Sequence, residues 1–134
     1  MLSDRFRAAV EQGNVEQLQD LLHADAAFRS PVLFKPYEGR DQVLKVLRAA
    51  KAVLGIGGKF GYVHQLEDAD DRVAMLEFAT EVDGKLIEGI DILSFDEAGL
   101  ITELKVMIRP ASALQLVGAR MAAEFPKVGL GVPG

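Results

Sequence analysis

The stretch "LIEGIDILSF", from Leu86 to Phe95, places one carboxylate in the middle of an apolar run typical of a β-strand. A buried carboxylate without a partner costs several kcal/mol, or it becomes neutral through a raised pKa. Asp91 must therefore point to water, find a hydrogen-bonding partner, or line a cavity in which its acid–base chemistry is used.

Three further side chains could take part in such chemistry. His64 lies on an alternating stripe with Phe60 and Tyr62, so it is a candidate to share a cavity with Asp91. A His–Asp pair can transfer protons, although a single histidine on a strand is more often a residue of the cavity rim. Tyr62 and Tyr37 can each hydrogen-bond a ligand or Asp91, and packing with the hydroxyl in water explains them equally well.

Other kinds of site are excluded by composition and motif order. The chain has no cysteine and only two histidines, so we expect no metal site. The glycine-rich "GIGG" at 55–58 follows an expected helix and leads into a strand, the reverse of a dinucleotide loop, and we expect no cofactor.

The charge balance argues against nucleic acid and anionic membranes as partners. Lys and Arg number 15 against 20 Asp and Glu, a net charge of −5, and no basic cluster occurs. No apolar run approaches the roughly 20 residues that span a bilayer. The first residues, "MLSDRFRAAV", carry charges where a signal peptide needs an apolar stretch, so we expect a cytoplasmic protein.

The elements that must position these residues follow from hydrophobic periodicity. A first helix is predicted to begin after Ser3, which we expect to be its cap. A second is predicted over 15–22, after an Asn14–Gln17 capping box. Two longer helices are predicted over 39–54 and 110–125. A short strand is predicted within 26–37. Four strand-like runs follow at 59–67, 72–82, 85–95 and 100–108, joined by short turns that include Asp83-Gly84, a strong hairpin signal.

This order predicts an α+β fold in which helices cover one face of a bent antiparallel meander. A curved sheet folded over helices leaves a cone whose open end is a natural small-molecule pocket. We expect one domain over residues 1–126 and a loosely ordered tail over 127–134.

The element order and several segments resemble the NTF2-like superfamily, and within it the SnoaL-like and ketosteroid-isomerase-like branch. The segments that carry the resemblance are "AAVEQGNVEQLQDLL", "ADAAFRSPV", "EGRDQVLKVL", "EGIDILSFDEAGLI" and "KVMIRPASALQL", and together they run from about Ser3 to Phe125. The resemblance implies a cone made by a curved antiparallel sheet wrapped around N-terminal helices, with a C-terminal helix.

Laid over the chain, the steroid-isomerase pattern matches at one of three functional positions. Asp91 falls where the isomerases place a protonated, hydrogen-bonding aspartate. Phe6 stands where they have a tyrosine, and Ser30 stands where they have the aspartate that moves the proton. A neutral serine is no base without help from a neighbour. Ordinary steroid isomerase activity is therefore not expected.

The resemblance also assigns the Asp91 face of the sheet to the interior of the cone. The residues expected to line the ligand site are Phe6, Ser30, Phe34, Phe60, Tyr62, Phe78, Thr80, Leu93 and Val106. Our first hypothesis is a protein that binds a small apolar molecule bearing a polar group. The alternatives are an isomerase, cyclase or dehydratase that uses Asp91 with possible help from His64, and a non-catalytic protein-interaction module.

The other face of the sheet combines apolar residues with charges of both signs. Met75, Ile90 and Ile92 accompany Glu77 and Lys105 on this face. Related cone proteins commonly pair through this face, so we expect a homodimer through the convex side of the sheet. Ordinary surface is the competing interpretation.

Overall fold

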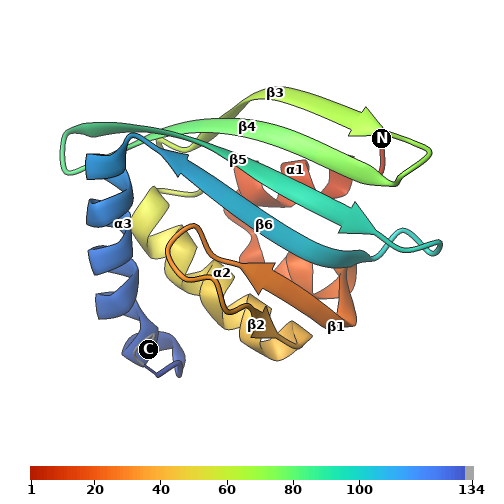
Figure 1. Ribbon diagram of the computed structural model, residues 1–134, viewed down its shortest axis with the longest axis horizontal. Coiled ribbons are helices and arrows are strands. Elements are labelled where there is room, and N and C mark those ends of the chain that lie inside the picture. The colour runs from red at the N-terminus through yellow and green to blue at the C-terminus, as the bar shows by residue number, and fades with distance from the viewer. Residues whose placement is uncertain (132–134) are drawn as a thin grey trace.

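The computed structural model describes residues 1–131, in which helices precede, interrupt and follow the strands of a single sheet (Figure 1). The helical elements are α1 (Asp4–Glu11), the 3₁₀ turn η1 (Val15–Leu21), α2 (Arg40–Leu54), α3 (Ala111–Glu124) and the 3₁₀ turn η2 (Phe125–Val128). The strands are β1 (Leu22–Arg29), β2 (Tyr37–Glu38), β3 (Gly61–Asp68), β4 (Val73–Val82), β5 (Lys85–Phe95) and β6 (Ile101–Arg109). The α+β fold expected from the sequence is confirmed.

The four long strands β3 to β6 form the predicted antiparallel meander. At the β4–β5 turn, Asp83 and Gly84 both have positive φ, 53° and 78°, which is the conformation that an Asp-Gly hairpin requires. The sheet continues beyond β6 because β1 pairs with β6 in parallel and β2 pairs with β1, giving the order β2-β1-β6-β5-β4-β3.

The sheet curves over the helices, and the core lies between the two (Figure 1). Helix α2 buries the stripe that periodicity predicts, since Val43, Leu44, Leu47, Ala50 and Leu54 are all buried. Helix α3 stands at the end of the sheet where β6 finishes, and it contacts α2 (Figure 1). The strands therefore present one face to helices and the other to solvent.

Two local expectations at the N-terminus are corrected. Residues 15–21 form a 3₁₀ turn rather than an α-helix, because the segment is short and passes directly into β1. Ser3 makes no cap hydrogen bond; its fully buried hydroxyl instead donates to Glu67 Oε2 at 3.0 Å and so fastens α1 to β3. Asn14 does accept the expected bond from the backbone N–H of Gln17, at 3.2 Å.

The tail is more ordered than expected as far as residue 131. Residues 125–128 form η2, and Leu130 is buried in the main core with its N–H bonded to the carbonyl of Phe125 at 2.9 Å. An apolar side chain that gains burial holds its segment in place, so the loose tail predicted from residue 127 is wrong there. The remainder of that predicted tail, 132–134, lies outside the described residues.

Candidate functional site

Asp91 lies at the middle of β5 and points into the interior, where it pairs with a tyrosine. The Tyr62 hydroxyl donates to Asp91 Oδ2 at 2.6 Å, a short hydrogen bond of the charge-assisted kind. Both side chains are buried, and Tyr62 is held by an edge-on contact with Phe60 at 5.2 Å between ring centroids. Within residues 1–131, Asp91 Oδ1 has no hydrogen-bond partner. One oxygen of the acid is therefore occupied and the other is available.

The environment of this pair shifts its acidity. Burial raises the pKa of Asp91 to about 7, and the hydrogen bond from Tyr62 opposes the rise. Burial also raises the pKa of Tyr62 well above its usual value, and the nearby Asp91 charge adds to the effect. Near neutral pH, Asp91 therefore exists both as an acid that can donate a hydrogen bond and as a carboxylate that can accept one.

A cavity of about 80 Å³ opens beside the pair. Its walls come from the sheet, from α1 and α2, from α3 and from the loop that follows β1. Among the lining residues of the described chain, Asp91 is the one carboxylate; Tyr62, Tyr37 and Ser30 supply the hydroxyl groups. The site is thus an apolar hollow with few polar groups, the usual character of a small-molecule pocket.

Six of the residues expected at the ligand site line this cavity together with Asp91. They are Phe6, Ser30, Phe60, Tyr62, Phe78 and Val106. The Ser30 oxygen accepts the N–H groups of Val32 and Leu33 at 2.9 and 3.1 Å, so this serine also shapes the loop that covers the cavity. What role each side chain has toward a ligand stays a proposal.

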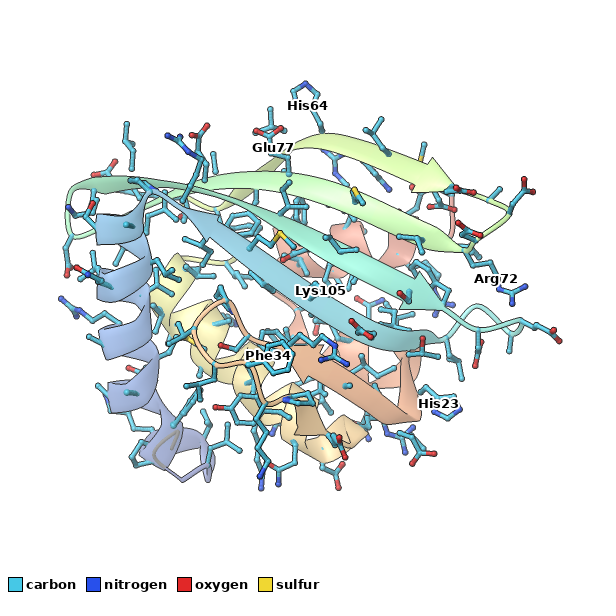
Figure 2. The ribbon with its side chains drawn as sticks, in the orientation of Figure 1. His23, Phe34, His64, Arg72, Glu77 and Lys105 are labelled. Carbon is cyan, nitrogen blue, oxygen red and sulfur yellow. The ribbon has the colours of Figure 1, made fainter. Side chains whose placement is uncertain are left out.

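Three expected lining residues lie elsewhere. Phe34 is 93% exposed on the loop after β1 (Figure 2), because the turn around Ser30 directs this part of the loop outward into a separate surface groove. Thr80 donates to the carbonyl of Leu54 at 2.7 Å and satisfies the C-terminal end of α2. Leu93 is fully buried in the packed core and does not line this cavity.

The expectation that His64 enters the cavity is wrong. Tyr62 pairs with Phe78, but His64 pairs with Glu77, so one extra residue, Val63, is inserted in β3 as a bulge. The insertion shifts the alternation by one and turns His64 to the outer face (Figure 2). There its ring nitrogen Nδ1 lies 2.9 Å from Glu77 Oε1, and its side chain is 71% exposed.

Sequence reasoning missed the part of the wall made by α3 and the loop after β1. The missed residues are Pro31, Val32, Leu33, Val117, Gly118 and Met121. Val117 and Met121 are apolar residues four positions apart in the helix predicted over 110–125, and this helical spacing was the available signal. The loop gave none, because a proline-containing connection shows no periodicity that tells which side chains turn inward.

Neither a metal centre nor a membrane span is found in the described chain. Residues 1–131 contain no group of three or more histidine, aspartate or glutamate side chains placed to hold a metal ion. In the same range, no helix combines the length and the apolar character needed to cross a bilayer.

Comparisons with known proteins agree on the fold. The family model of the SnoaL-like domain matches residues 4–104. A crystal structure of a steroid delta-isomerase from Pseudomonas aeruginosa is 35% identical, with a TM-score of 0.87 over 94% of this chain and 90% of that one. An uncharacterised protein with a cystatin-like fold from Silicibacter pomeroyi is 27% identical, with a TM-score of 0.84 over 92% of this chain and 84% of that one.

More distant structures show the same architecture. An NTF2-like protein of unknown function from Cytophaga hutchinsonii is 20% identical, with a TM-score of 0.59 over 84% of this chain and 90% of that one. The comparison with curated proteins gave no match. The family model covers most of the sheet and the helices beneath it, including Asp91 and Tyr62. This chain therefore belongs to the SnoaL-like domain family, and it shares the fold of NTF2-like proteins.

Proposed function

We propose that this protein binds a small, mostly apolar molecule and recognises an oxygen of that molecule through Asp91. The observation that carries the proposal is the free oxygen Oδ1 of a buried acid whose other oxygen is held by Tyr62. When Asp91 is protonated, the proton sits on Oδ1, because Oδ2 already accepts the Tyr62 hydroxyl. A carbonyl oxygen of the ligand would accept this proton as a hydrogen bond.

The size of the cavity adds a condition to the proposal. A volume of about 80 Å³ is far below the roughly 300 Å³ at the lower end of typical ligand pockets. The loop and α3 are in close contact, since a Cβ added at Gly118 would lie 3.3 Å from the Val32 side chain. A ligand of several rings would therefore enter by separating the loop after β1 from α3.

A matched pair of probes tests the binding proposal. Phenylcyclohexane and 4-phenylcyclohexanone differ by the carbonyl oxygen, and each would be added to wild type and to Asp91→Ala in thermal melts. We expect the ketone to raise the melting temperature of wild type more than the hydrocarbon does, and the difference to vanish in Asp91→Ala. The extra rise in melting temperature that the ketone gives should also decline as the pH rises through about 7, where Asp91 loses its proton.

Glu77→Ala supplies the control, since Glu77 lies on the outer face with His64. This variant should keep the preference of wild type for the ketone. Equal responses to ketone and hydrocarbon in wild type would rule the proposal out.

A second candidate function is proton-transfer catalysis by the same pair. Two observations favour it: a pKa of about 7 suits an acid–base group working at neutral pH, and the Pseudomonas aeruginosa steroid delta-isomerase is 35% identical. The positions of Phe6 and Ser30 argue for a reaction other than that of ordinary steroid isomerases. On this hypothesis, Asp91→Asn abolishes turnover of an enolisable ketone while the fold survives. Turnover would be measured as incorporation of deuterium from the solvent into the ketone.

The expected homodimer stays a prediction. Outward-facing Leu66, Met75 and Met107 are exposed, and Glu88 and Arg109 form an ion pair on the same face. Such a mixture of apolar and charged side chains suits a second copy of the chain, whose face would offer the same groups in reverse order. Sedimentation analysis at micromolar concentration decides this, because a monomer would exclude the pairing.

A further inference from the structure

The Tyr37 hydroxyl is a buried polar atom that no group of the described chain satisfies. Its oxygen has less than 1 Å² of accessible surface, and within residues 1–131 it has no hydrogen-bond partner. Burial also raises the pKa of this phenol. Most buried polar atoms in folded proteins are paired, so an unpaired one requires a specific explanation.

The position of the hydroxyl is fixed by packing of the ring. Tyr37 contacts Phe125 edge-on, with 5.8 Å between ring centroids, and lies tilted against Phe28 at 6.4 Å. These contacts use only the aromatic ring, so phenylalanine would make them equally well. The hydroxyl therefore adds no packing contact or hydrogen bond to those that the ring already makes within residues 1–131.

Tyr37 lines the same cavity as Asp91, from β2 at one edge of the sheet. Asp91 is on β5 and Tyr37 is on β2, and β6 and β1 lie between them. Three strand spacings correspond to roughly 14 Å between the two backbones. Both side chains point into the curved interior, which brings their polar atoms nearer to each other than that. The wall between them consists mainly of apolar side chains, among them Leu104 and Val106.

We propose that the Tyr37 hydroxyl is a second hydrogen-bonding contact for the ligand, at the far end of the cavity from Asp91. The inference rests on the proposed function and makes its ligand class more specific. The ligand would have an apolar ring body with a carbonyl at the end facing Asp91 and a hydroxyl or second carbonyl at the end facing Tyr37. A phenol both donates and accepts, so either group can pair with it.

A ligand comparison tests this contact. The probes are 4-phenylcyclohexanone and 4-(4-hydroxyphenyl)cyclohexanone, whose added hydroxyl lies at the end opposite the carbonyl. The dissociation constants of both probes would be measured by calorimetry for each protein. The quantity compared between proteins is the ratio of these two constants. We expect the hydroxyl to improve the affinity of wild type roughly threefold to tenfold, as one good neutral hydrogen bond does. In Tyr37→Phe the ratio should fall to about one.

The only other tyrosine provides the matched control. Tyr62→Phe makes the same chemical change at the Asp91 end, so it should retain the advantage of the hydroxylated probe even where it weakens both ketones. Two outcomes overturn this inference and leave the proposed function intact. In one, the preference for the hydroxylated probe persists in Tyr37→Phe. In the other, wild type binds 4-phenylcyclohexanone but shows no such preference. No binding of either ketone to wild type overturns both.

The stability of the unliganded variant gives an independent readout. If the hydroxyl serves a ligand, Tyr37→Phe should melt a few degrees higher than wild type without any ligand, because an unpaired buried hydroxyl is removed. A lower melting temperature would mean that the hydroxyl stabilises the fold, through a bound water for example, and would count against a role in ligand recognition.

Discussion

Two hydrogen-bonded pairs of side chains lie on opposite faces of the same part of the sheet. Inside, the Tyr62 hydroxyl donates to Asp91 at 2.6 Å; outside, His64 and Glu77 approach to 2.9 Å (Figure 2). Tyr62 and His64 are two residues apart on β3. Each pair consists of a carboxylate and a ring-bearing side chain with a titratable proton.

The difference between the pairs is one of environment. Asp91 is buried and its pKa rises to about 7, whereas Glu77 and His64 are in contact with solvent. Water screens an exposed pair and leaves it little energetic weight, while a buried acid in apolar walls becomes a group with usable acid–base chemistry. The chemistry of this site thus depends more on which face a residue occupies than on its type.

The largest expected effect comes from removing the charge of Asp91. Its folded-state pKa lies above the unfolded value, so the folded protein holds this proton longer. The stability that Asp91 contributes is complete below about pH 4 and is lost as the pH rises to about 7. Asp91→Asn should match wild type at pH 3 and exceed it at pH 8 by about 4 kcal/mol in urea unfolding.

Glu77→Gln makes the same chemical change on the outer face. Its unfolding free energy should differ from that of wild type by less than about 1 kcal/mol at either pH, because the pair is exposed. If Asp91→Asn also showed no pH-dependent difference, the contrast between the two faces would be lost.

The next largest effect on stability should come from adding a methyl group at a glycine of the sheet, because the two faces differ in the space they leave for it. Gly89 pairs with Phe78, and a Cβ at Gly89 would lie 2.3 Å from Phe78 Cζ and 2.6 Å from the Met107 carbonyl. Gly89→Ala should therefore lower the unfolding free energy by about 3 kcal/mol in denaturant titrations. Gly61→Ala, where nothing lies within 4 Å, should be nearly neutral. Similar losses at both positions would show that the glycines act through backbone freedom and not through space.

A smaller effect should follow from removing the partner of each acid. Tyr62→Phe leaves a buried carboxyl without its donor and should lower the unfolding free energy by about 2 kcal/mol at pH 8. His64→Ala removes an exposed partner and should change the unfolding free energy by less than about 1 kcal/mol. The reverse order would mean that the buried pair is already neutral and loosely coupled at that pH. Chemical unfolding monitored by circular dichroism measures both.

The elements of this fold are predictable from local patterns. The Asp83-Gly84 turn, the helical stripe of Val43, Leu47 and Leu54, and the alternation around Asp91 each depend on neighbours in sequence, so periodicity finds them. The parallel pairing of β1 with β6 joins segments about 75 residues apart. No local pattern specifies such a contact, and the sequence predicted only a short strand there.

The candidate site was predictable where strand alternation is regular. Asp91 and Phe78 lie on uninterrupted parts of their strands and face inward as expected. His64 follows a bulge and Phe34 follows a turn, and at both positions one local irregularity reverses the direction of the side chain. Bulges depend on how neighbouring strands fit together, so the residues of a single strand do not reveal them.

By itself, the sequence determined that an acid would stand in the centre of an apolar strand within a helix-covered sheet, because these features follow from residue order and periodicity. Only the tertiary structure decided which partner the acid has, how small the hollow beside it is, and that Tyr37 shares it. The reason is physical: burial and pairing depend on segments distant in sequence, and these two quantities set the acidity of Asp91.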